Sequence, residues 1–304
     1  MATRAATAQT NRFEMDVSPA IQSDPLSGRL VLVISKTAQA EPRLLIGPQG
    51  PAMFAIDLEQ LPAGGRAVID QSSLGYPGPL GTLPPGEYTV QAVINVYNQV
   101  RRADGHTVWL PTNDGTQEFF SNAAGHLYSE PQKVRVGDGA TIHLTVSKRV
   151  PPATRPTDTE WVKYVTIESR KLSQFWGRPT FIHATVLLPK GYSDHPTAKY
   201  PTVLTFGHNV PFSFTTGSTR VRGRGTINTT TGLETGYDFH RSWTADGFPR
   251  FIAVSFEQQT PFFPDSYSLN SVNSGPYGDA MIEEVIPFLE QRFRMIAKPY
   301  ARLV

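Results

Sequence analysis

The chain has 304 residues, of which 39% are hydrophobic, with a formal net charge of +2 and no cysteine. The near-neutral charge gives no electrostatic drive toward nucleic acid or membrane surfaces, and the lack of cysteine excludes disulfides, thiol nucleophiles and cysteine-bound zinc. No run approaches the roughly 18 apolar residues that a membrane-spanning helix needs, so no membrane span is predicted. The length is enough for two domains, and 26 prolines with 25 glycines favour turns and short strands.

Residues 1–27 are predicted to form an N-terminal segment outside the first domain, either flexible or the remnant of a trimmed signal. The opening MATRAATAQTNRF has one positive charge at Arg4 and small residues in an A-x-A pattern, but no apolar stretch. A cytosolic start and a trimmed signal both fit this composition. The small residues favour the second, and with it a secreted or periplasmic location over a cytoplasmic one.

Residues 28–148 alternate short β-rich runs with turns that contain glycine and proline. The run LPPGEYTVQAVINVYN predicts a strand whose inner face carries Tyr88, Val90, Ala92, Ile94 and Val96. The runs QKVRV and ATIHLTV are separated by Gly-Asp-Gly, which predicts a hairpin, and GTQEFFSNAAGHLYSE predicts a long loop. Short strands without a long helical period favour an antiparallel, immunoglobulin-like sandwich.

Residues 149–157, within the proline-rich stretch SKRVPPATRPTDTE, are predicted to form a linker. From residue 158 the pattern changes. The runs WVKYVTIES and FIHATVLLP predict an antiparallel pair, while YPTVLTFG and RFIAVSFE have the nearly continuous apolar composition of strands buried on both faces. Between these two, DFHRSWTADGFP predicts a crossover helix.

The segment YGDAMIEEVIPFLEQRFRMI predicts an amphipathic helix with an apolar face of Ile282, Val285, Ile286, Leu289 and Phe293. Pro287 is expected to kink this helix because it removes a backbone donor. Asp279 is expected to cap the start of the helix. Strands and helices in alternation predict an α/β sheet.

Residues 158–304 resemble the esterase family of enterochelin-esterase and esterase-D type, within the α/β-hydrolase superfamily. The resemblance rests on YPTVLTFGHN, on DSYSLNSVNSGPYGDAMIEEVIPFLEQRFR and on KPYARLV. It implies a doubly wound sheet, incomplete here. In the full-length form it implies hydrolysis of a small-molecule carboxylic ester by a serine, an acid and a histidine, without metal or cofactor. In that family a strand like ARLV leads into a Gly-x-Ser-x-Gly nucleophile elbow, and the acid and histidine come later.

No Gly-x-Ser-x-Gly occurs in the chain. The triad is therefore expected beyond residue 304, with its serine within about ten residues, and the 304-residue chain is expected to contain no catalytic residue and to lack serine-hydrolase activity. The nearest alternative is the run Gly191-Tyr192-Ser193-Asp194-His195. It is predicted to be a polar turn, because triad members converge from separate elements.

Two loops are candidate parts of a substrate site. By the resemblance, the loop after the third strand supplies one oxyanion donor, and the candidate residues are Gly207, His208 and Asn209. A tight turn without a ligand role is the alternative for this loop. The loop before the last helix holds the candidate pocket-mouth residues Tyr267, Asn270 and Asn273.

Other polar clusters are assigned no site. Arg220, Arg222 and Arg224 are compatible with a phosphate or acidic-substrate site, but a solvated loop is the favoured interpretation. The seven histidines show no metal-binding spacing, so no zinc site is predicted. The alternative to the esterase is a non-catalytic binding or interaction protein whose β-sandwich is the functional module. Composition leaves the oligomeric state open.

Overall fold

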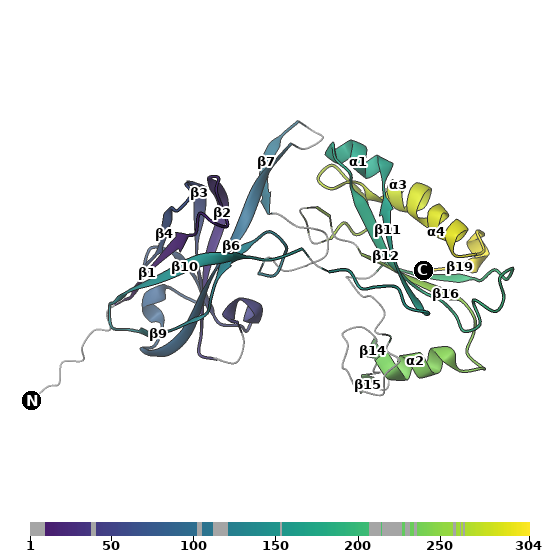
Figure 1. Ribbon diagram of the computed structural model, residues 1–304, viewed down its shortest axis with the longest axis horizontal. Coiled ribbons are helices and arrows are strands. Elements are labelled where there is room, and N and C mark those ends of the chain that lie inside the picture. The colour runs from purple at the N-terminus through teal and green to yellow at the C-terminus, as the bar shows by residue number, and fades with distance from the viewer. Residues whose placement is uncertain are drawn as a thin grey trace, which may run out of the picture. The chain divides into compact units, whose positions relative to one another are not determined.

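The computed structural model describes residues 10–37, 41–101, 105–111, 121–152, 154–206, 214, 227–228, 232–233, 236–257, 260–261, 263 and 265–304. Strand accounts for 42% of it and helix for 17%. The strands form mixed sheets, one of which is a curled half-barrel (Figure 1). The chain divides into two compact units. Unit 1 comprises Met1–Val100 and Thr107–Ala153, and unit 2 comprises Arg101–His106 and Thr154–Val304.

Unit 1 is built on a single sheet of ten strands. Its main path runs in the order β4-β1-β10-β8-β6-β2-β3-β5, and β7 and β9 each pair with β6. The strands are β1 (Arg12–Val17), β2 (Leu26–Ser35), β3 (Ala52–Leu61), β4 (Arg66–Ile69), β5 (Leu74–Tyr76), β6 (Gly86–Arg101), β7 (Thr107–Pro111), β8 (Leu127–Ser129), β9 (Gln132–Val136) and β10 (Thr141–Arg149). Two short 3₁₀ helices, η1 (Pro42–Leu45) and η2 (Leu80–Thr82), connect them.

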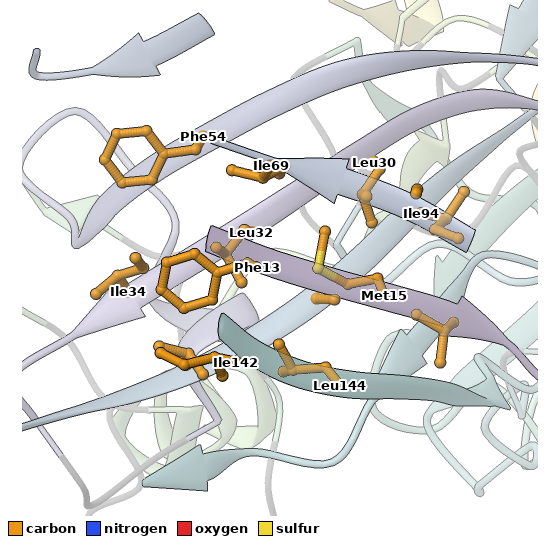
Figure 2. Close-up of a cluster of buried hydrophobic side chains, with 14 of the residues drawn as sticks. Phe13, Met15, Leu30, Leu32, Ile34, Phe54, Ile69, Ile94, Ile142 and Leu144 are labelled. Carbon is orange, nitrogen blue, oxygen red and sulfur yellow. The ribbon is translucent and has the colours of Figure 1, made fainter. Parts of the chain in front are cut away.

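The expected domain start at residue 28 is wrong, because β1 is an integral strand of this sheet. It pairs in parallel with β10, placing Phe13 beside Ile142 and Met15 beside Leu144. Phe13 and Met15 are fully buried, and Figure 2 shows both side chains among those of the core. Apolar residues alternate with polar ones in RFEMDV, which is the strand pattern that the prediction for residues 1–27 did not use.

The hairpin predicted across Gly137-Asp138-Gly139 does not form. Instead β9 pairs with β6, and β10 pairs with β1 and β8. The side chain of Asn11, just before β1, holds the turn between β9 and β10: its Oδ1 accepts from the Gly137 N–H at 2.6 Å, and its Nδ2 donates to Asp138 Oδ1 at 2.7 Å. In a hairpin β9 would pair with β10, but β1 occupies that edge of β10.

The predicted inner face of β6 is confirmed. Tyr88, Val90, Ala92 and Ile94 are buried in one core with residues of β1, β2, β3 and β10, and Val96 packs against it. The predicted long loop is wrong at its end, because Leu127–Ser129 forms β8 between β10 and β6. β8 has only three residues, and no turn signal separates it from the flanking loops. Its pattern is therefore too short to identify from sequence.

Unit 2 has a sheet of five strands in the order β11-β12-β16-β13-β19. These are β11 (Val162–Glu168), β12 (Phe181–Leu187), β13 (Thr202–Thr205), β16 (Ile252–Glu257) and β19 (Arg302–Leu303). The predicted antiparallel pair is confirmed as β11 and β12. β12 is also antiparallel to β16, whereas β13 runs parallel to both β16 and β19. Two ribbons, β14 (Ile227–Asn228) with β15 (Gly232–Leu233) and β17 (Asn270–Ser271) with β18 (Gly275–Pro276), lie outside it.

Helices cover both faces of the unit 2 sheet (Figure 1). The predicted crossover helix is confirmed as α2 (Gly236–Thr244), whose Trp243 packs with Leu187 and Ala253. The opposite face, which includes Val254, is covered by α1 (Arg170–Trp176), α3 (Tyr277–Ala280), η3 (Met281–Val285) and α4 (Ile286–Arg292). A 3₁₀ turn, η4 (Pro299–Ala301), precedes β19. In the described parts of the chain, no helix has the length and apolar character needed to cross a membrane.

The last helix forms in three segments because Pro287 interrupts its hydrogen bonding. Proline has no N–H for the carbonyl four residues earlier, and the chain accommodates it with a π-helical turn at Met281–Val285. The wider turn shifts the apolar face, so Met281 is 3% exposed and Ile282 is 66% exposed. The assignment of Ile282 to the buried face is therefore wrong. The other four predicted positions are buried: Val285, Ile286, Leu289 and Phe293.

An arginine joins β4 to β1 on the surface of unit 1. Arg66 donates from Nε to Asp16 Oδ1 at 2.7 Å and from Nη1 to Glu14 Oε2 at 2.8 Å. Hydrogen bonding to Arg66 lowers the pKa of the Asp16 carboxyl. The pKa of the Glu14 carboxyl is also lowered, by the hydrogen bond from Arg12 and by the charge of Arg66.

Replacement of this arginine is expected to change the acid response of unit 1. A carboxyl whose pKa is lower in the folded state adds stability above its unfolded pKa, and this is lost as the pH falls through the folded value. Arg66→Ala should therefore show a smaller loss of unit 1 melting temperature between about pH 6 and about pH 3 than the wild type. Calorimetry at both pH values measures it, with Lys133→Ala on exposed β9 as the control. Equal losses in the wild type and Arg66→Ala would contradict the ion-pair explanation.

Candidate functional site

Three parallel strands of unit 2 end at the same edge of the sheet. They are β13, β16 and β19, with β13 in the middle. The chain passes from β13 through α2 to β16 on one side, and then through α3, η3 and α4 to β19 on the other. Because these helices lie on opposite faces, the loops after β13 and β16 leave this edge in opposite directions. We call the edge at which β13, β16 and β19 end the carboxyl edge.

The loop after β13 holds the candidate oxyanion residues. Gly207, His208 and Asn209 lie outside the described residues, as do Arg220, Arg222 and Arg224. The last described residue before the loop is Phe206, whose ring lies 4.9 Å from that of Phe256 on β16. This places the start of the loop at the carboxyl edge, where the predicted donor has to lie.

The carboxylate at the end of β16 is engaged in an ion pair. Glu257 Oε1 lies 3.4 Å from Nη1 of Arg155, and both side chains are partly buried. The guanidinium occupies part of the hydrogen-bonding capacity of this carboxylate. Glu257 therefore fits a structural role at the carboxyl edge better than a catalytic one.

The loop after β16 carries the three pocket-mouth candidates, and all three are exposed. Tyr267 and Ser268 have φ angles of 51° and 50°, in the left-handed region that non-glycine residues seldom occupy. The Asp265 carboxylate accepts from the Tyr267 N–H at 2.6 Å and holds this turn. The Tyr267 side chain is 63% exposed, so a fixed backbone presents its phenol to solvent.

The second candidate, Asn270, is bound to the start of α3. Its Oδ1 accepts from the Asp279 N–H at 3.0 Å, and its Nδ2 donates to Asp279 Oδ1 at 2.9 Å. The expectation that Asp279 caps the helix is wrong, because α3 has no side-chain cap at its N-cap, Pro276. Asn270 instead supplies the acceptor for an N–H that the helix leaves unpaired. Asp279 in the first turn still favours the positive end of the helix dipole.

The third candidate, Asn273, lies at an exposed turn between β17 and β18. Its N–H donates to Ser271 Oγ at 3.0 Å. Gly275 closes the turn with a φ of 99°, and a Cβ there would come within 2.9 Å of the Phe175 ring. The structure therefore brings all three candidates onto one ordered loop, with Asn270 fixing it and Tyr267 and Asn273 exposed.

The run Gly191-Tyr192-Ser193-Asp194-His195 forms turns rather than a catalytic group. The guanidinium of Arg294 holds this segment from outside: Nη2 donates to the Tyr192 carbonyl at 2.6 Å, and Nη1 donates to the His195 carbonyl. Among the residues that the structure describes, no group of three or more His, Cys, Asp or Glu is placed to hold a metal ion.

Sequence reading missed a buried phenol close to this loop. Tyr277, the first residue of α3, is 2% exposed, and burial raises the pKa of its hydroxyl. Within the described residues this hydroxyl has no hydrogen-bond partner. A neutral, buried O–H remains a donor that costs free energy until it is paired. An isolated tyrosine within an apolar helical pattern gives no sequence signal of this kind.

The described residues of unit 1 line two cavities of the size of small-molecule sites, and neither was predicted. One, of about 590 Å³, has Lys36, Phe54 and Tyr88 in its wall. The other, of about 450 Å³, has Tyr97 and Trp109 in its wall, with acidic and amide side chains beside them. Both are formed by residues distant in sequence, which is why no local motif marks them.

Comparison with known proteins assigns no family to the chain. No protein-family model matches it, and no curated protein matches it significantly. The fold, the side chains at the carboxyl edge and the motif resemblance are therefore the basis of the functional proposal.

Removal of the Asn270 side chain is expected to loosen the start of α3. Asn270→Ala leaves the Asp279 N–H without its acceptor, which for a lost cap costs about 1 kcal/mol. Hydrogen exchange in peptides covering α3 and η3 should become roughly fivefold faster. The matched control is Asn273→Ala in the same loop, which should leave exchange unchanged. If both variants exchange at the wild-type rate, Asn270 does not fix the helix start.

Proposed function

We propose that unit 2 is the leading part of an α/β-hydrolase domain of the esterase family, and that the complete domain hydrolyses carboxylic esters of small molecules. The observation that carries the proposal is the position of β13 between two parallel neighbours, β16 and β19. In α/β-hydrolases, the loop after the third strand gives one oxyanion donor. In chain order, β13 is the third strand of this sheet, and Gly207, His208 and Asn209 follow it.

The position of β19 supports the same assignment. It pairs in parallel with β13, Thr202 beside Arg302 and Val203 beside Leu303. A turn that follows β19 therefore opens at the same edge as the loop after β13. The esterase family places its nucleophile elbow directly after such a strand, which brings the serine to face the oxyanion loop. In this proposal the serine, the acid and the histidine all follow residue 304.

The reaction proposed for the complete domain is acyl transfer in two steps. The serine Oγ attacks the ester carbonyl while the histidine takes its proton, and the histidine then protonates the departing alcohol. Water, deprotonated by the same histidine, attacks the acyl-enzyme, and the acid product leaves with the serine restored. One backbone N–H of the loop after β13 and the N–H of the residue after the serine stabilise the oxyanion in both steps. Tyr267 and Asn273, on the loop that Asn270 fixes, are proposed to contact substrate at the pocket mouth.

Unit 1 is proposed to be an immunoglobulin-like β-domain. Inward side chains from strands at both ends of its sheet, including β1 and β3, meet in one core, which is the packing that a sandwich requires. The second candidate function is non-catalytic ligand binding by this unit. The two cavities of about 590 and 450 Å³ are the observation that favours it.

The 304-residue chain is expected to show no serine-hydrolase activity, because it has no Gly-x-Ser-x-Gly elbow. A fluorescent fluorophosphonate probe labels only activated serines, so it should label this chain no more than heat-unfolded chain. Hydrolysis of p-nitrophenyl acetate should match the buffer rate. Ser193→Ala controls for the serine of the polar turn. Labelling of the wild type that disappears in Ser193→Ala would place a nucleophile within unit 2 and contradict the assignment of the triad.

A further inference from the structure

A cleft on unit 1 combines an exposed indole with hydrogen-bonding side chains. Its volume is about 450 Å³. We call it the Trp109 cleft, and its polar and aromatic wall consists of Ser27, Asp57, Glu59, Gln60, Tyr97 and Trp109. All six residues belong to unit 1, so the cleft is defined within one compact unit.

Neighbouring strands bring these residues together. β7 pairs with β6, β6 with β2, and β2 with β3, so Trp109, Tyr97, Ser27 and Asp57 lie on successive strands. Ser27 is directly opposite Tyr97 on one side. On the other side, the register shifts between Leu26 and Gly28, and Glu59 and Gln60 together oppose Ser27. Such a bulge redirects side chains and is frequent next to binding sites.

The bulge is held by specific contacts. Gln60 has a φ of 49°, and its N–H and Nε2 lie 3.2 Å and 3.0 Å from Ser27 Oγ as donors. A Cβ on Gly28 would lie 2.3 Å from the Asn95 carbonyl oxygen, so only glycine permits this approach of β2 to β6. These contacts therefore fix the backbone of β2 and β3 beneath the cleft.

The cleft lies on the outer face of the sheet. Leu30 and Leu32 of β2 point into the core, and side chains alternate along a strand. Ser27 and Arg29, with their partners Tyr97 and Asp57, therefore face away from it. Trp109 is 47% exposed, whereas Trp161 and Trp176 are half-buried and Trp243 is buried. Trp109 and Tyr97 thus add two aromatic rings to the wall of a cleft that also carries polar side chains.

The polar groups of the wall include both donors and acceptors. Asp57 accepts two hydrogen bonds from Arg29, at 2.8 and 3.0 Å, and this pairing lowers the pKa of the Asp57 carboxyl. Glu59 adds an exposed carboxylate, and the Gln60 amide offers N–H and C=O groups. A ligand rich in hydroxyls, which donate and accept at once, matches this mixture.

The face of an indole is electron-rich and attracts the weakly positive C–H groups of a sugar ring as well as cations. A cation would use the indole face and the acceptors but none of the donors, and the guanidinium of Arg29 beside Asp57 disfavours it. We propose that the Trp109 cleft binds a neutral oligosaccharide, with one pyranose ring stacked on Trp109 and its hydroxyls bonded to Asp57, Glu59 and Gln60. This inference is independent of the esterase proposal and names a ligand class for unit 1.

Calorimetric titration of the 304-residue chain with cellohexaose, xylohexaose, mannohexaose and N-acetylchitohexaose tests the proposal. At least one hexaose should bind with a dissociation constant in the range of about 10 µM to 1 mM. Trp109→Ala should weaken it at least tenfold, and Trp109→Phe, which keeps a smaller ring, should weaken it less. Leu74→Ala removes another exposed apolar side chain, outside the cleft, and should leave binding unchanged.

Three results would overturn the proposal. The first is no saturable binding of any hexaose by folded wild-type chain up to about 10 mM. The second is binding that Trp109→Ala leaves intact. The third is binding of tetramethylammonium, lost in Trp109→Ala, without binding of any hexaose, which would make the cleft a cation site. None of these outcomes depends on fluorophosphonate labelling, so this proposal and the esterase proposal fail separately.

Discussion

The parallel pairing of β13 with strands on both sides is the constraint on which unit 2 depends. A strand of four residues with two hydrogen-bonded neighbours is buried within the sheet and cannot slip without exposing its side chains. The connections that make it central run in opposite directions, so α2 covers one face and α3, η3 and α4 cover the other. In open α/β sheets, ligands bind outside the carboxyl ends of the strands where the strand order reverses. The edge that holds the two candidate loops is therefore set by topology.

In unit 1 the curl of its single sheet determines which face is available for a candidate site. The inner face forms a core to which β1 contributes Phe13 and Met15, while on the outer face Val31, Val33 and Val93 form a second, smaller cluster. At one end of that outer face, a bulge and a glycine that lets β2 approach β6 turn a flat surface into a cleft. The two units thus place their candidate sites by different means, a reversal of strand order in one and an irregularity of register in the other.

The sequence predicted those elements whose signal is local. The alternation in β6, the apolar runs of β13 and β16 and the pattern of α2 each specify one element, and all are found. Non-local pairing explains the errors: β1 rather than β9 takes the edge of β10, and Asn270 rather than Asp279 serves the start of α3. Ile282 was misplaced because a π turn alters the helical period. The Trp109 cleft draws on four strands, so no short stretch of sequence encodes it.

The claim that β19 lies beside β13 is tested most directly by a disulfide, since the chain has no cysteine of its own. Val203 and Leu303 are register partners, so their Cα atoms are about 4.8 Å apart, within disulfide range. Val203→Cys with Leu303→Cys should form an intramolecular disulfide under mild oxidation, seen as a 2 Da mass loss (roughly the two thiol hydrogens). Thr205→Cys with Leu303→Cys, about 8 Å apart, should not. Equal cross-linking of both pairs, or none in the first, would contradict the topology.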